Sequence, residues 1–202
     1  PMSRQIIQAY YDAFNRGDAA GMLALLSDDV EHHVNEGAVR RGKALFAEFC
    51  SHMGVSYRET LTDIEIFTNG EGTRAAAEFV VNGEYLKTDP GLPEARGQRY
   101  VLPGGSFLAL RDGKITRVTT YYNLQDWIAQ VSASVVTLTG DQILAVLDDL
   151  ARLRIEVFRA WPYLYDGDMF YERRYLSHFA QGAGSVVICA YDGSRMVGAS
   201  TG

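Results

Sequence analysis

Four long stretches with strand character dominate the middle of this 202-residue chain and limit what it can fold into. They cover residues 57–68, 73–88, 98–111 and 114–123. The segments between them are rich in turn residues, and Asp112-Gly113 in particular favours a tight hairpin. Strands of this length that pair in sequence predict one strongly bent antiparallel sheet.

Helical patterns surround these strands. Ser3 is expected to cap a first amphipathic helix and Asp18 a second. A strand is then expected over residues 28–37, a third helix over 42–54, and a short closing helix over 124–131. We expect the N-terminal helices to cover the concave face of the sheet, because no other nearby segment has the apolar area to do so.

The composition is that of an ordinary globular protein, since 47% hydrophobic and 22% charged residues suffice to bury a core. The net charge of −6 argues against a nucleic-acid partner, which needs a clustered basic face. Two distant cysteines, Cys50 and Cys189, indicate thiols in a reducing compartment, so we expect a cytoplasmic protein. No apolar run reaches the roughly 18 residues of a membrane span, so no membrane partner is expected.

Residues 1–131 resemble the NTF2-like superfamily, a cone-shaped α+β fold that includes ketosteroid isomerase and the SnoaL-like polyketide cyclases. The resemblance is carried by YYDAFNRGDAAGMLALLSDDVEHHV, EFVVNGEY, LPGGSFLALRDGKITRVTTYYN and LQDWIAQV. It implies a domain over residues 1–131 that binds a small apolar carbonyl compound. If this domain is an enzyme, the resemblance implies a general acid–base isomerase or cyclase with no organic cofactor, and a homodimer formed through the outer face of the sheet.

The same resemblance suggests two catalytic residues. Tyr10 falls where ketosteroid isomerase keeps the tyrosine that donates to the dienolate oxygen. Gly105 falls where the isomerase keeps a protonated aspartate, and a missing donor costs about 3 kcal/mol of transition-state stabilisation. The catalytic aspartate of the isomerase aligns with Val34 when no gap is allowed, and with His32 after a slip of two residues.

His32 is the candidate general base. Strand alternation places it on the same face as two valines, pointing into the cone, with His33 pointing outward. An imidazole can take a proton next to a carbonyl while Tyr10 stabilises the oxyanion. The alternative is a core histidine that donates to a backbone carbonyl. No metal site is expected, because adjacent histidines on a strand point to opposite faces.

Further side chains are expected to shape a substrate cavity. They are Phe14, Val34, Tyr57, Phe79, Phe107, Tyr121 and Asn123. Tyr121 and Asn123 end the last long strand near the expected mouth of the cone, and Tyr57 is expected to reach the same region.

Residues 132–202 are expected to form a second, partial α/β segment. The pattern predicts a strand, helices over 141–158 and 169–179, and a hairpin around Asp192-Gly193. This order resembles the N-terminal half of a GNAT acetyltransferase, truncated before the loop that holds the pyrophosphate of acetyl-CoA. Acetyl-CoA is therefore expected only for a longer parent protein. The alternative function of the first domain is then a non-catalytic ligand-binding or dimerisation module of a two-domain GNAT acetyltransferase.

Overall fold

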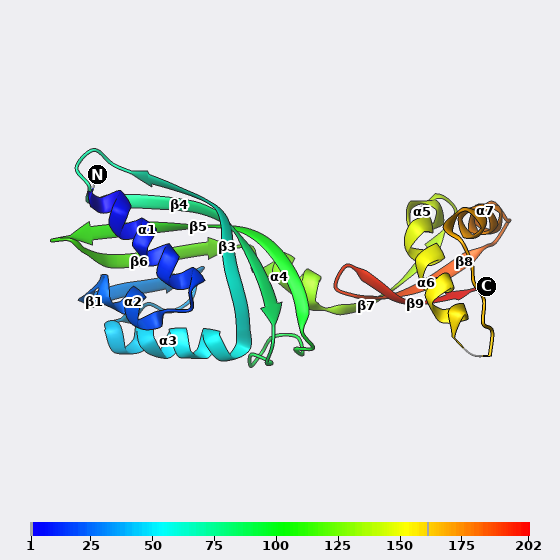
Figure 1. Ribbon diagram of the computed structural model, residues 1–202, viewed down its shortest axis with the longest axis horizontal. Helices are drawn as coiled ribbons and strands as arrows, with labels where there is room; N and C mark the ends of the chain where they lie inside the picture. The colour runs from blue at the N-terminus through cyan, green and yellow to red at the C-terminus, as the bar shows by residue number, and fades with distance from the viewer. Residues whose placement is uncertain (1, 161) are drawn as a thin grey trace. The chain divides into compact units, whose positions relative to one another are not determined.

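The computed structural model describes residues 2–160 and 162–202, which divide into two compact units (Figure 1). The first unit ends at Val131, and the second comprises Ser132–Gly202. Each unit has its own sheet and its own hydrophobic core.

The first unit has a mixed α+β architecture. Its helices are α1 (Met2–Asn15), α2 (Ala19–Ala24), α3 (Lys43–Ser56) and α4 (Leu124–Val131). Its strands are β1 (Leu26–Val34), β2 (Arg40–Arg41), β3 (Tyr57–Thr68), β4 (Arg74–Tyr85), β5 (Gln98–Arg111) and β6 (Lys114–Tyr122). They form one sheet in the order β2-β1-β6-β5-β4-β3, antiparallel except where β1 pairs with β6.

The long strands follow the predicted pattern closely; turns join β3 to β4 and β5 to β6, and a loop over residues 86–97 joins β4 to β5. Asp112 and Gly113 both have positive φ, +53° and +74°, which gives the tight turn between β5 and β6. The register of β3 against β4 shifts between Thr62 and Glu65, and Asp63 has a φ of +53° at that shift. Such an irregularity bends a strand, and Figure 1 shows β3 curving along its length.

The two predicted helix caps have different outcomes. Asp18 caps α2 as predicted, because its carboxylate accepts the Gly21 N–H at 2.8 Å. The prediction for Ser3 is wrong, since α1 begins at Met2 and Ser3 lies within its first turn. Ser3 is buried against Gly72 of the β3–β4 turn, so its small size suits this position.

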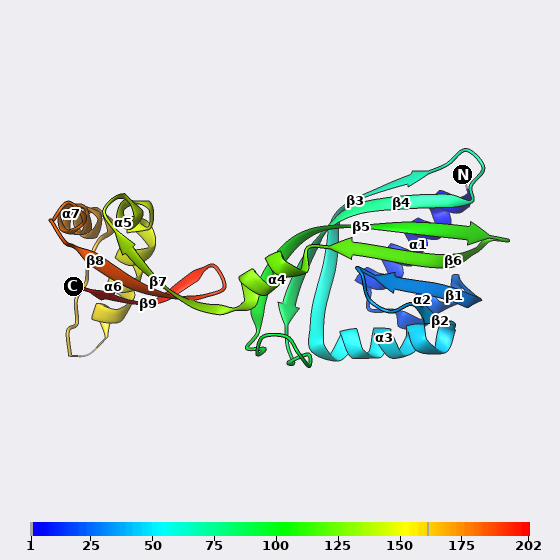
Figure 2. The same ribbon diagram turned by 180° about the vertical axis from the view of Figure 1, so that it is seen from behind.

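The core of the first unit lies between the helices and the concave face of the sheet. In Figure 1 α1 crosses that face, and in Figure 2 it lies behind the sheet. Ile7, Tyr10 and Tyr11 come from α1, and Phe46 comes from α3. Burying a side chain such as Phe46 contributes about 1.5–3 kcal/mol. The mixed α+β fold with a curved, helix-covered sheet is therefore confirmed.

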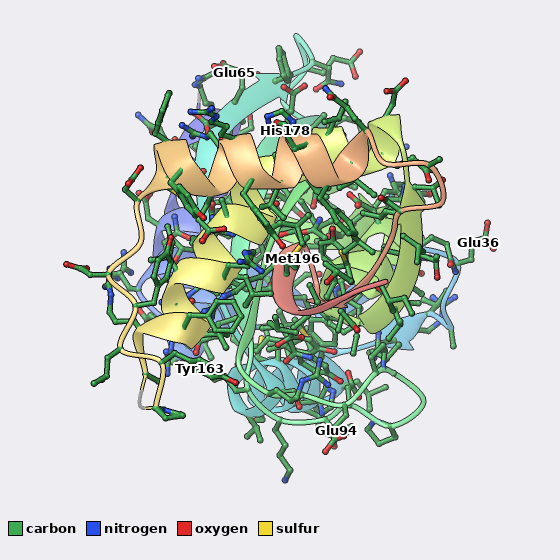
Figure 3. The ribbon with its side chains drawn as sticks, turned by 90° about the vertical axis from the view of Figure 1, so that its right-hand side faces the viewer. Glu36, Glu65, Glu94, Tyr163, His178 and Met196 are labelled. Carbon is green, nitrogen blue, oxygen red and sulfur yellow. The ribbon has the colours of Figure 1, made fainter. Side chains whose placement is uncertain are left out.

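The second unit contains β7 (Ala133–Thr139), α5 (Asp141–Ala145), α6 (Leu147–Arg159), α7 (Met169–Ala180), β8 (Val186–Asp192) and β9 (Arg195–Thr201). Its sheet is antiparallel in the order β7-β8-β9. The single helix predicted over 141–158 is instead two helices that meet at Val146. The backbone angles of Val146, φ −116° and ψ +16°, are not helical, and its N–H donates to the Ile143 carbonyl three residues earlier. Met196 of β9, labelled in Figure 3, joins a core formed with α6 and α7.

Candidate functional site

His32 lies on the inner face of β1 and packs against α3. The imidazole is 3% exposed, and its ring centroid is 4.6 Å from that of Phe46 and 4.5 Å from that of Phe49. Among the described residues, none forms a hydrogen bond with its buried Nδ1. The structure thus places His32 inward, whereas the His33 ring lies beside Glu31, with Nε2 3.6 Å from Oε2.

The environment of His32 disfavours its charged form. Burial lowers the pKa of His32 to about 4, and the positive charges of Arg40 and His33 add to the effect. At neutral pH the ring is therefore uncharged. A neutral imidazole keeps one nitrogen lone pair that can accept a proton.

Tyr10 and Tyr11 both enter the core from α1, with ring centroids 5.2 Å apart. Burial raises the pKa of Tyr10 well above its usual value, and neighbouring Tyr11 and Cys50 raise it further. Burial also raises the pKa of Tyr11 to about 12. Both phenols stay protonated at neutral pH and can donate hydrogen bonds. The Tyr10 ring contacts Tyr11, whereas the His32 ring contacts Phe46 and Phe49. Among the described residues, no aromatic ring contacts both of the predicted catalytic side chains.

The placement of Gly105 differs from the one expected. Residues of β5 alternate in burial, so Gly105 faces outward, where a Cβ would meet the Ala77 carbonyl. The inner position belongs to Ser106, whose hydroxyl is 2.8 Å from that of Thr120. The Tyr11 hydroxyl approaches Ser106, but it reaches hydrogen-bond geometry with no described residue. Ser106 and Thr120 are thus interior polar groups that sequence reasoning missed.

The residues predicted to line a cavity separate into two groups. Phe14, Val34 and Phe79 lie on the inner side, where Phe14 and Phe79 pack in the main core. The placement of Phe107 and Tyr121 in the interior is wrong: they are 54% and 51% exposed and contact each other on the outer face. Strand alternation is the reason, since their neighbours Ser106 and Tyr122 take the inner positions.

Asn123 also has a different position from the one predicted. It is exposed, and its side-chain oxygen accepts the Asp126 N–H at 3.1 Å, so it caps the start of α4. The role of the Asn123 side chain is therefore to stabilise the start of this helix.

Tyr57 belongs to a polar cluster at one end of the sheet. Its hydroxyl donates to Asp89 Oδ2 at 2.7 Å, and the same oxygen lies 3.0 Å from His52 Nε2. Beside this pair, the Tyr100 hydroxyl donates to Glu59 Oε1 at 2.5 Å. We call the set of His52, Tyr57, Glu59, Asp89, Tyr100 and Tyr122 the end cluster.

Aromatic rings enclose the end cluster on one side. Tyr57 stacks on Tyr85, with ring centroids 5.3 Å apart and planes 13° from parallel. Trp127 of α4 contacts both rings edge-on and also contacts Tyr100. Glu59 was not among the predicted site residues. The signal that could have found it is a carboxylate between Tyr57 and Leu61 on the inner face of a strand, where charged side chains are unusual.

The electrostatics of the end cluster follow from burial and from its two carboxylates. Burial raises the pKa of Glu59, although the hydrogen bond from Tyr100 partly opposes this effect. Burial raises the pKa of Tyr57, and so does its bond to Asp89. Burial raises the pKa of Tyr122, and the charges of Glu59 and Asp89 raise it further.

Two classes of feature are missing from residues 2–160 and 162–202. No three metal-ligating side chains gather there into a group able to hold a metal ion. Within the same residues, no helix has the length and apolar character required to span a membrane.

The architecture of the first unit defines an NTF2-like fold. An NTF2-like protein of unknown function from Burkholderia pseudomallei K96243 has a TM-score of 0.54 at 18% identity, covering 63% of this chain and 95% of that one. The SnoaL-like domain model matches residues 7–118. The chain therefore belongs to the SnoaL-like domain family.

Three solved structures with the provisional name polyketide cyclase are much more similar in sequence. The protein from Xanthomonas campestris pv. campestris is 59% identical, with a TM-score of 0.64, and covers 65% of this chain and 97% of its own. That from Silicibacter sp. TM1040 is 65% identical, with a TM-score of 0.63 and coverages of 64% and 95%. That from Pseudomonas putida KT2440 is 54% identical, with a TM-score of 0.64 and coverages of 64% and 98%. No curated protein is significantly similar to the chain.

Proposed function

We propose that the first unit catalyses cyclase-type proton transfer on a small apolar carbonyl compound. The observation that carries the proposal is the buried, neutral imidazole of His32, whose Nδ1 has no hydrogen-bond partner among the described residues. The identity of 54–65% to proteins provisionally named polyketide cyclases supports this class of reaction. An isomerase uses the same chemistry, because both reactions begin with removal of a proton next to a carbonyl.

In this proposal His32 is the general base and Tyr10 the hydrogen-bond donor. His32 takes a proton from the carbon beside the carbonyl, the C–H electron pair forms the enolate, and Tyr10 donates to the developing oxyanion. A pKa of about 4 gives His32 a basicity similar to that of the aspartate base of ketosteroid isomerase, about 4.6. Substrate reaches the ring by displacing Phe49, which is partly exposed and covered by the Arg40 guanidinium 4.9 Å away.

Exchange of the α-hydrogens of 2-tetralone in deuterium oxide, followed by proton NMR, tests these roles. We expect His32→Gln and Tyr10→Phe each to slow the catalysed exchange by about 100-fold or more, because each variant removes one proton-transfer or oxyanion contact. His33→Gln is the matched control, since His33 points away from the core, and it should stay within about twofold. Unchanged exchange in both core variants would remove His32 and Tyr10 from the mechanism.

We also propose that the outer face of the sheet forms a homodimer. In Figure 2 this face is left uncovered by α1 and α2. It carries exposed apolar side chains, namely Phe67, Val101, Phe107 and Tyr121. Phe107 and Tyr121 contact each other there, and exposed apolar side chains on an uncovered sheet face are typical of protein interfaces.

Sedimentation equilibrium tests the dimer. We expect the unmodified chain to sediment as a dimer and Phe107→Lys to weaken association by about 100-fold, because a charge would then be buried at the interface. Phe170→Lys, on an exposed position of α7, is the control and should remain dimeric. A monomeric unmodified chain would contradict the proposal.

The alternative function concerns the second unit. We propose that residues 132–202 form the N-terminal part of a GNAT-like fold, with the first unit as a ligand-binding or dimerisation module. The order of strand, helices and hairpin, with β8 in the centre of the sheet, supports this proposal. The SnoaL-like match lies within residues 7–118 and does not bear on it. Calorimetry with acetyl-CoA on a longer parent protein distinguishes this function from catalysis in the first unit.

A further inference from the structure

The sheet of the second unit has an edge strand, β7, that lacks the features by which proteins protect a sheet edge. The order β7-β8-β9 leaves one side of β7 without a neighbouring strand among the described residues. Charged residues, prolines, bulges or a very short length normally discourage further pairing at such an edge. The sequence of β7 is ASVVTLT, which contains no charge and no proline, and its register with β8 is regular.

The other edge strands of the two described sheets each have a protective feature. In the first unit, β2 consists of two arginines only, and β3 carries Asp63, with a φ of +53°, at its register shift. In the second unit, β9 begins with Arg195, and its register with β8 shifts next to Gly198. Among these edges, β7 is therefore the one open to pairing with a further strand.

The hydrogen-bond pattern identifies which backbone groups of β7 face the open edge. The Gly193 N–H donates to the Ser132 carbonyl at 3.2 Å, immediately before the first paired residues of the ladder. Because an antiparallel ladder alternates, every second residue from Ser132 onward bonds to β8, and the residues between them point the other way. The Thr139 N–H agrees with this pattern, since it donates to Gln142 Oε1 at 3.2 Å. The N–H and C=O groups at the open edge, which bond to no other described residue, belong to Ala133, Val135 and Thr137.

These groups are complementary to a second copy of themselves. When two antiparallel copies of β7 are placed with Val135 opposite Val135, Ala133 of each copy lies opposite Thr137 of the other. Every N–H and C=O group at the open edge then has a partner. Since β7 has no charged side chain, no like charges meet, and the Val135 side chain, 71% exposed in one copy, contacts its equivalent in the other.

We propose that β7 pairs antiparallel with β7 of a second copy of this chain, in the register that places Val135 opposite itself. The pairing joins the two three-stranded sheets into one continuous sheet through an isologous interface. The interface is small, so it forms at higher protein concentration than the outer-face dimer of the first unit. It rests on a different surface and stands whether or not that dimer forms.

Amide hydrogen exchange followed by NMR tests the pairing in the Phe107→Lys chain, in which the outer face of the first unit does not contribute. We expect exchange at Val135 and Thr137 to slow as the protein concentration rises, because their N–H groups become bonded to the second copy. Exchange at Val136 should not change, since its N–H already bonds to β8. Exchange at Val135 that is independent of concentration would overturn the proposal, and this is also the result expected if the edge instead pairs with a strand of another protein.

A charge exchange at Val135 tests the register. In the same Phe107→Lys chain, Val135→Lys and Val135→Glu should each weaken self-association by about fivefold or more, because like charges then lie directly opposite each other. An equal mixture of the two variants should recover the association, which a misfolded variant could not do. If the mixture associates no better than either variant alone, Val135 does not lie opposite itself and the proposed register is wrong.

Val197→Lys is the matched control on the other edge strand. Val197 of β9 is 49% exposed, so this variant introduces the same charge at an exposed valine of the same sheet. We expect its self-association to equal that of the Phe107→Lys chain. Association that is lost in Val197→Lys and kept in Val135→Lys would assign the contact to β9 and contradict the proposal. Sedimentation of the unmodified chain against Phe107→Lys tests the outer-face dimer separately, so the failure of one interface is distinguished from the failure of the other.

Discussion

Lowering the pH from 7 to 4 is expected to destabilise the first unit by about 3 kcal/mol through His32 alone. Burial lowers the pKa of His32 to about 4 in the folded chain, against 6.5 for the free side chain. As the pH falls below 6.5, His32 is protonated in the unfolded state but not in the folded state. The free energy of unfolding therefore decreases until the pH reaches the pKa of His32 in the folded chain. About 2 kcal/mol of this loss is already present at pH 5.

The measurement compares the unmodified chain with His32→Leu by hydrogen exchange and mass spectrometry on peptides from β1 and α3. Other groups titrate in both proteins, so the difference between their pH dependences isolates His32. The unmodified chain should lose protection relative to His32→Leu between pH 7 and pH 4. Parallel pH profiles for the unmodified chain and His32→Leu would show that the imidazole is not kept neutral by burial.

The long antiparallel strands were predictable because each is bounded by residues with a strong local conformational preference. Asp112-Gly113 is the clearest case, since both residues adopt the positive φ that the turn needs. The parallel pairing of β1 with β6 depends instead on contacts between residues about 85 positions apart, such as His32 opposite Val118. No local pattern encodes such a pairing.

The errors at the candidate site have two physical origins. Phe107 and Tyr121 are predicted to line the cavity, Tyr121 because it ends the last long strand near the expected mouth of the cone. The alternation set by their buried neighbours instead directs both side chains to the outer face. The end cluster was missed because Asp89 lies in a loop, and its contact with Tyr57 spans 32 residues. The sequence of a loop rich in turn residues does not indicate which of its side chains will contact the sheet.

The buried ion pair of the second unit carries the largest expected effect of a single substitution. Glu172 of α7 is fully buried, and its Oε2 accepts from Arg154 Nε of α6 at 2.7 Å. The Arg154 guanidinium also lies over the rings of Phe158 and Tyr175. Arg154→Met would leave a buried carboxylate without its cation, so we expect a loss of about 3–5 kcal/mol of stability. Hydrogen exchange of peptides from α6 and α7 measures this loss.

The same substitution tests whether the two units unfold separately, as we propose from their separate cores. Peptides from β1 and α3 should keep their protection in Arg154→Met, just as the His32 effect should be confined to the first unit. The double variant Arg154→Met/Glu172→Leu should recover most of the lost stability, because an apolar pair replaces the buried charges without leaving either unpaired. If protection falls equally in both units, their unfolding is coupled, and if the double variant is no more stable than Arg154→Met, the loss comes from packing rather than from the orphaned charge.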